Sequence, residues 1–187
     1  MRGGPSQQRE KHSYVDPATF TPHFSWGKSG GKSNDGESVC CDGIALSDIA
    51  EEADTPTYVY SQAAIGEAYN ELVTGLGALP HTLCFAVKSN GNLAILKYLA
   101  GLGSGFDIVS GGELQHLQRI GVPGKRIVFS GVGKTREEMH EALRYRVNRR
   151  SGARGILLFN IESEAELAAL LEESARERKR GAAVPAV

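Results

Sequence analysis

The most constraining feature of this chain is a regular alternation that begins at Thr57, where short apolar runs alternate with amphipathic stretches of helical length. Short segments of Gly, Asn or Ser separate the two kinds of stretch, as turn residues do between regular elements. Strands that alternate with helices form βα units, and such units build a mainly parallel sheet. We expect five strand and helix pairs: 57–60 with a helix after Ser61, 83–87 with 93–102, 106–109 with 112–120, 126–129 with 136–146, and 155–160 with 164–179.

The spacing of side chains supports these helices. Leucines recur at every third position of the second helix, and the third helix repeats the pattern at Leu114, Leu117 and Ile120. An S/T-x-x-E capping box stands at three strand-to-helix junctions: Ser110 with Glu113, Thr135 with Glu138, and Ser163 with Glu166. Ser61 is expected to cap the first helix, whose apolar residues share one face: Ile65, Ala68, Tyr69, Leu72 and Leu76. The strands are continuous apolar runs, which predicts that both faces of the sheet are buried.

The number of units predicts an incomplete barrel. A closed (β/α)₈ barrel takes about 250 residues. The 187 residues of this chain hold four or five units, and residues 182–187 have the character of one more strand. We therefore expect an α/β fold, a partial (β/α)₈ TIM barrel that is truncated on its C-terminal side.

The segment before the barrel has a different composition. Residues 1–38 are rich in Gly, Ser, Lys and Asn, which predicts a mobile leader, and residues 39–56 form an approach segment to the barrel at 57–187. The stretch 27–33 reads G-x-x-x-G-K-S, one residue short of a phosphate-binding P-loop. Trp26 takes the place of the first glycine and no apolar strand precedes it, so we do not assign a nucleotide site.

Charge and cysteine content exclude several classes of protein. Lys and Arg number 21 against 22 Asp and Glu, so there is no basic field for nucleic acid, and the basic link at 144–154 reads as a solvated loop. Cys40, Cys41 and Cys84 have neither disulfide-framework nor zinc-site spacing, which favours a reduced, cytoplasmic setting. No signal peptide or membrane-spanning stretch is expected.

One lysine stands where chemistry is expected. In the segment 84–92 an apolar strand ends directly in Lys88, followed by Ser, Asn and Gly. The carboxyl ends of parallel strands are where barrels and open α/β sheets build their active sites. A lysine there can form an imine with a carbonyl cofactor, and partial burial would favour its uncharged, nucleophilic form. The alternative is that Lys88 only ends the strand with a solvated charge.

Several motifs then follow one another in a recognisable order: TPTYVYS at 55–61, FAVKSN at 85–90, GFDIVSGGEL at 105–114, IVFSGVGKT at 127–135 and FNIESEAEL at 159–167. Over residues 40–187 their order and spacing resemble the fold-type III pyridoxal-phosphate-dependent decarboxylases, chiefly the diaminopimelate decarboxylase family. The approach segment, with GIALSDIA at 43–50, favours the diaminopimelate branch.

The resemblance implies roles for individual residues. Lys88 is the lysine that binds pyridoxal 5′-phosphate covalently, Asp107 lies beside the cofactor, and Glu113 and Lys134 lie near the barrel mouth. Glu113 remains open between cofactor binding and helix capping, whereas capping suffices for Ser163 and Glu166. His81, His116 and His140 belong to no motif and receive no role.

The resemblance also implies a reaction, the decarboxylation of meso-2,6-diaminopimelate to L-lysine by a homodimer of the complete enzyme. The family's glycine-rich phosphate loop, the acidic partner of the pyridine nitrogen and the C-terminal β-domain would follow Val187, so we expect this chain alone to be inactive. The alternatives are part of an ornithine or arginine decarboxylase, a non-catalytic pyridoxal-phosphate-binding module, or a gene remnant. The partner is a small amino-acid substrate, with neither nucleic acid nor membrane.

Overall fold

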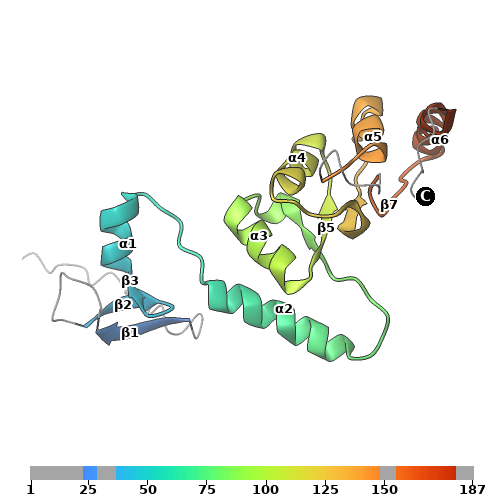
Figure 1. Cartoon of the computed structure of the whole chain (residues 1–187). Coiled ribbons are helices and arrows are strands. Elements are labelled where there is room, and N and C mark those ends of the chain that lie inside the picture. The colour runs from blue at the N-terminus through green and yellow to red at the C-terminus, as the bar shows by residue number, and fades with distance from the viewer. Residues whose placement is uncertain (1–22, 29–36, 148–154, 180–187) are drawn as a thin grey trace, which may run out of the picture. The chain divides into compact units, whose positions relative to one another are not determined.

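The structure, a computed structural model, describes residues 23–28, 37–147 and 155–179. The chain divides into two compact units with the boundary after Leu72 (Figure 1). Each unit is considered by itself. Among the described residues, none of the helices has the length and hydropathy needed to cross a bilayer.

The first unit holds a small antiparallel sheet of three strands, β1 (Phe24–Lys28), β2 (Glu37–Cys41) and β3 (Ile44–Ala45), followed by helix α1 (Leu46–Ala53). Asp42 and Gly43 form the turn between β2 and β3, and both have positive φ angles, 49° and 81°. An Asp-Gly pair suits such a two-residue hairpin, because glycine adopts positive φ without a steric penalty and aspartate tolerates it. Cys40, Cys41 and Ala45 are buried in this unit.

Strand β1 lies within the range that we expected to be a mobile leader. Trp26 is paired in register with Val39 of β2, so backbone hydrogen bonds order a segment whose polar composition predicted none. Gly27 and Lys28, the first residues of the P-loop-like stretch, are the last residues of β1. Residues 29–33 of that stretch lie outside the described residues.

The expected strand at 57–60 is wrong. These residues pair with no strand in the part of the chain that the structure describes, and Tyr58 is 89% exposed. A β-favouring run becomes a strand only when a neighbouring strand pairs with it. The helix that follows, α2 (Gln62–Leu76), begins as expected, since Ser61 Oγ accepts a hydrogen bond from the Ala64 backbone N–H at 2.9 Å.

The second unit is built on a parallel sheet, as the alternation predicted. Its four strands lie in sequence order: β4 (Cys84–Ala86), β5 (Gly105–Ile108), β6 (Ile127–Phe129) and β7 (Leu158–Phe159). The connections carry helices α3 (Leu93–Leu102), α4 (Gly111–Arg119), α5 (Arg136–Leu143) and α6 (Glu164–Lys179) after the last strand. Two short 3₁₀ turns, η2 (Val87–Ser89) and η3 (Gly124–Arg126), flank β4 and β6.

The expected bounds of α3 and α6 are confirmed, and α5 ends at Leu143 instead of 146. Strands β4, β6 and β7 are shorter than expected, and β5 keeps the expected length but begins one residue earlier. The pairing of strands decides the strand ends, and sequence alone does not show where pairing stops. Residues 182–187, expected to begin another strand, lie outside the described residues.

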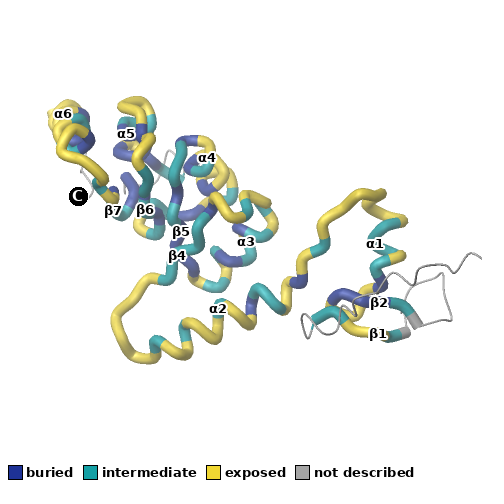
Figure 2. The backbone as a smooth tube through the Cα atoms, turned by 180° about the vertical axis from the view of Figure 1, so that it is seen from behind, coloured by how far each residue is buried: buried dark blue, intermediate teal, exposed yellow. Residues whose placement is uncertain are grey.

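The two faces of the parallel sheet differ in burial. One face is buried at β5, β6 and β7, where it carries Phe106, Ile108, Ile127, Phe129 and Phe159, and half-buried at Phe85 of β4. The opposite face, which we call the inner face, is only half-buried and carries Ala86, Asp107, Val128 and Leu158. The expectation that both faces are buried is therefore wrong for this chain. Figure 2 shows the buried strand segments beside the helices of the second unit.

Candidate active site at the carboxyl ends of the strands

The carboxyl ends of β4 to β7 bring together the residues that the sequence singled out. Lys88 lies in the turn η2, directly after β4. Ser89 Oγ donates to the Ala86 carbonyl at 2.7 Å, and Asn92 caps α3 by accepting from the Ala94 N–H at 2.9 Å. These hydrogen bonds fix the backbone on both sides of the lysine.

The Lys88 side chain itself is exposed. Within the described residues it has neither a hydrogen bond nor an ion pair. The partial burial that we expected is absent, because the inner face of the sheet is open beside β4. Lys88 thus presents an unpaired amine at the end of a strand.

Asp107 lies in β5, in register with Ala86 of β4. Its carboxylate accepts a hydrogen bond from Ser130 Oγ, in the turn after β6. Ser130 Oγ in turn accepts from Asn160 Nδ2, in the turn after β7, at 2.9 Å. A chain of hydrogen bonds therefore runs across three neighbouring strand ends and ends on Asp107. Neither Ser130 nor Asn160 was singled out from the sequence.

Glu113 acts as a cap at the start of α4. Its backbone N–H donates to Ser110 Oγ at 3.3 Å, and its carboxylate accepts from the Val109 N–H at 2.7 Å. The capping geometry expected for Ser110 and Glu113 is thus confirmed, except that the Glu113 carboxylate accepts from the backbone N–H of Val109 and not from that of Ser110. Capping accounts for one carboxylate oxygen, Oε2, and Oε1 has no partner among the described residues.

Glu138 joins the starts of two neighbouring helices. It completes the capping box of α5 with Thr135, and its other oxygen accepts from the Gly111 N–H of α4 at 2.7 Å. Burial acts to raise the pKa of Glu138, but hydrogen bonds from Thr135 and Gly111 outweigh burial and lower that pKa below its ordinary value. The carboxylate is therefore held charged between the two helix N-termini.

Lys134 and Glu166 form a buried ion pair at the same edge. The Lys134 side chain has 0% exposure, and Nζ donates to Glu166 Oε1 at 2.6 Å, to Gly131 O at 2.6 Å and to Asn160 O at 2.8 Å. All three ammonium protons thus have acceptors. Ser163 caps α6, since its Oγ accepts from the Glu166 backbone N–H at 3.2 Å, which confirms the capping expected for this pair. Lys134 is a structural clamp between the turns after β6 and β7.

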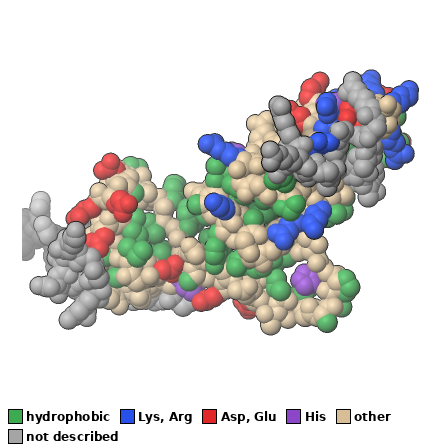
Figure 3. Space-filling view, in the orientation of Figure 1, with side chains coloured by type: hydrophobic (Ala, Val, Ile, Leu, Met, Phe, Trp, Pro, Cys, Tyr) green, Lys and Arg blue, Asp and Glu red, His purple; other side chains and the backbone are tan. Residues whose placement is uncertain are grey.

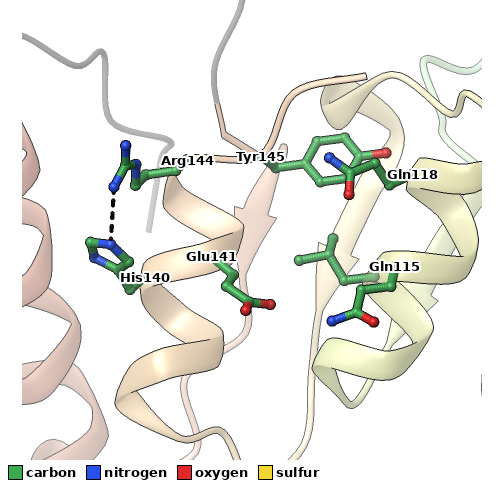
Figure 4. A pocket seen from close by; sticks show the side chains of 7 residues that line it. Gln115, Gln118, His140, Glu141, Arg144 and Tyr145 are labelled. Carbon is green, nitrogen blue, oxygen red and sulfur yellow. Dashed lines mark hydrogen bonds between the residues drawn. The ribbon is translucent and has the colours of Figure 1, made fainter. Parts of the chain in front are cut away.

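The histidines do not converge on this site. His116 is exposed on α4, near Gly91, and His81 bonds the Leu79 carbonyl through Nδ1 at 2.7 Å. His140 lies on α5 beside Arg144, in a pocket of about 570 Å³ between α4 and α5 (Figure 4). None of the residues that follow the strand ends lines this pocket.

Ion pairs join side chains of α5 and α6. Arg136 contacts Glu172 at 2.8 Å and the buried Glu173 at 3.4 Å, and Arg176 contacts Glu173 at 2.8 Å. Figure 3 shows Lys and Arg side chains gathered with carboxylates at this end of the molecule. The described residues contain no group of His, Cys, Asp and Glu suited to a metal ion.

The sequence matches the family described as pyridoxal-dependent decarboxylase, pyridoxal binding domain, over residues 62–182. It is 49% identical over 142 residues to the diaminopimelate decarboxylase of Pseudomonas fluorescens, which covers 76% of this chain and 32% of that protein. The chain therefore spans about a third of the length of the curated relatives it matches.

Two solved structures share the fold of this chain. AQ1208 from Aquifex aeolicus superposes with a TM-score of 0.70 at 34% identity, covering 84% of this chain and 34% of its own. Diaminopimelate decarboxylase from M. jannaschii, solved in co-complex with L-lysine, superposes with a TM-score of 0.64 at 34% identity, covering 79% of this chain and 33% of its own.

Proposed function

We propose, from the premise that this chain belongs to the pyridoxal-dependent decarboxylase family, that it forms the N-terminal part of a diaminopimelate decarboxylase. The whole enzyme would convert meso-2,6-diaminopimelate to L-lysine and carbon dioxide. This chain would supply the lysine that binds pyridoxal 5′-phosphate and one side of the active site. The observation that carries the proposal is an exposed Lys88 at the carboxyl end of a parallel strand, without a partner among the described residues, in a sequence 49% identical to such an enzyme over 142 residues.

The groups at the strand ends fit a carbonyl cofactor. A primary amine can form an imine with an aldehyde, and Lys88 Nζ has no ion-pair partner among the described residues that would compete for it. Asp107 supplies a carboxylate on the neighbouring strand, and Glu113 supplies a second carboxylate at the start of α4. When bound, pyridoxal phosphate provides an electron-accepting ring for the electrons released as the substrate loses its carboxylate.

We propose a part in this chemistry for five residues at the strand ends. Lys88 Nζ would hold the cofactor through the aldehyde carbon. Asp107 and Glu113 line the cofactor site and orient it by charge and hydrogen bonding. Lys134 and Glu166 contribute indirectly, because their hydrogen bonds fix the turns that follow β6 and β7.

The substrate and the assembly belong to the whole enzyme. We infer the amino-acid substrate from the sequence identity with diaminopimelate decarboxylases. We also propose that the complete protein is a homodimer in the cytoplasm. Neither nucleic acid nor membrane has a part in the proposed function.

A chimera tests whether this chain can take its proposed place. Residues 40–187 would replace the matching part of the Pseudomonas fluorescens enzyme, and lysine formation from meso-diaminopimelate would be measured. We expect activity in the chimera and its loss in the same chimera with Lys88→Ala. A chimera that folds and dimerises like its parent, yet forms no lysine, would contradict the proposal.

A further inference from the structure

The hydrogen-bond chain that ends on Asp107 has a defined direction. Asn160 Nδ2 can only donate, and it donates to Ser130 Oγ at 2.9 Å. Ser130 has a single hydroxyl proton, and that proton points to Asp107 Oδ1. The amide therefore fixes the hydroxyl, and the hydroxyl fixes one oxygen of the carboxylate. We call Asn160, Ser130 and Asp107 the inner-face relay.

The inner-face relay lies next to the cofactor lysine. Asp107 is paired in register with Ala86, two residues before Lys88, and strand β5 contacts the turn η2 that carries this lysine. A carboxylate and an ammonium group that close would attract each other. Even so, no ion pair joins Lys88 to Asp107 among the described residues, and Asp107 Oδ2 has no partner there.

The charge of the Lys88 amine decides whether it can react with the cofactor. A lysine held in an ion pair stays protonated, and a protonated amine cannot attack an aldehyde. The hydrogen bond from Ser130, which follows β6, occupies Asp107 Oδ1 and ties that oxygen to the turn after β6. The relay therefore removes Asp107 Oδ1 as a partner for Lys88, and an ion pair between the two would compete with binding of the cofactor.

We propose that Ser130 and Asn160 are positioning residues that hold Asp107 toward β6, and that this keeps the Lys88 amine free to react. The inference rests on the proposed function, since it concerns the availability of the same lysine. It adds two residues that make no contact with Lys88 in the described part of the chain.

Reductive trapping measures the availability of the amine. The purified chain is mixed with pyridoxal phosphate and cyanoborohydride. The uncharged Nζ attacks the aldehyde carbon, the aldehyde oxygen leaves as water, and hydride from cyanoborohydride reduces the C=N bond to a stable secondary amine. Peptide mapping then gives the initial rate of labelling at Lys88, with Lys88→Ala as the blank.

Variants of the relay should slow this labelling. We expect Ser130→Ala to lower the initial rate on the order of tenfold, the effect of losing one hydrogen bond to a charged group. Ser130→Thr keeps the hydroxyl and should restore most of the rate. Asn160→Asp, which exchanges the amide donor for an acceptor, should lower the rate as Ser130→Ala does, because it draws the Ser130 proton away from Asp107.

Two controls separate positioning from a general structural effect. Ser163→Ala removes a hydroxyl from the same edge of the sheet, at the cap of α6, and should leave the rate unchanged. In an Asp107→Asn background there is no carboxylate to release, so adding Ser130→Ala should change the rate little. Thermal unfolding of each variant verifies that the fold is retained.

The outcomes distinguish the relay from the proposed function. The relay is supported if the wild type is labelled at Lys88, Ser130→Ala is labelled more slowly, and Ser130→Thr regains most of the wild-type rate. It also requires that Ser130→Ala change the rate little in the Asp107→Asn background. Labelling in the wild type that is unchanged in Ser130→Ala overturns the relay and leaves the proposed function standing. Labelling of the wild type no greater than that of Lys88→Ala overturns the relay, because no reactive amine is then kept free, and the chimera tests the proposed function separately.

Discussion

Replacing Lys134 by methionine should destabilise the second unit by about 3 kcal/mol. The substitution keeps the length of the side chain, so it leaves little cavity, but it removes all three hydrogen bonds of a fully buried ammonium group. Removing one partner of a buried ion pair costs about 3–5 kcal/mol, because the other charge stays buried without compensation. Glu166 retains one hydrogen bond, from the Glu162 N–H at 3.0 Å, which places the expected value at the lower end.

Urea unfolding followed by circular dichroism measures this effect. With a slope of about 2 kcal/mol per molar urea, the midpoint should fall by about 1.5 M. Lys97→Met, the same change at an exposed position of α3, is the matched control and should leave the free energy of unfolding within about 0.5 kcal/mol of wild type. The double variant Lys134→Met with Glu166→Gln should be less destabilised than Lys134→Met alone. A Lys134→Met midpoint equal to that of Lys97→Met would refute the reasoning.

Three further predictions concern stability. Hydrogen bonds hold the pKa of Glu138 in the folded chain below its ordinary value. The charged carboxylate therefore stabilises the fold above the unfolded pKa of about 4.3, and this stabilisation is lost as the pH falls through the folded pKa. Glu138→Gln should make the free energy of unfolding less dependent on pH below about pH 4, and an unchanged pH dependence would contradict this. Gly105→Ala would place a methyl carbon 2.7 Å from Cys84 Sγ, so its melting temperature should fall by an amount equivalent to about 1–3 kcal/mol, and wild-type melting would show that the site has room. Tyr145→Phe removes a buried hydrogen bond of 2.7 Å to the Val122 carbonyl and should cost about 1 kcal/mol in urea unfolding, whereas a gain in stability would count against that bond.

The fold of the second unit could be predicted because local signals agreed with one another. Apolar spacing located α3 and α4, and the S/T-x-x-E patterns marked the starts of α4, α5 and α6. The first unit could not be predicted in this way. Strand β1 depends on pairing with β2, and the β-favouring run at 57–60 lacks a described partner, so local preference pointed the wrong way in both places.

The candidate site shows the same division. Lys88 could be found because it directly follows a strand, and Asp107 came from the resemblance to a family. Ser130 and Asn160 are common turn residues, and only the register of β5, β6 and β7 brings them to Asp107. Lys134 pairs with Glu166 across 32 positions of sequence, and no local pattern predicts such a contact. The exposure of Lys88 follows from the open inner face, which sequence alone did not reveal.

The most direct test of the central claim is to locate the pyridoxal phosphate adduct. The purified chain would be incubated with the cofactor, reduced with borohydride and mapped by mass spectrometry, with Lys88→Ala beside it. We predict one dominant adduct, on Lys88, that disappears in the variant. Adducts spread over the exposed lysines, with no preference for Lys88 and no change in the variant, would contradict the claim that this chain carries the cofactor lysine.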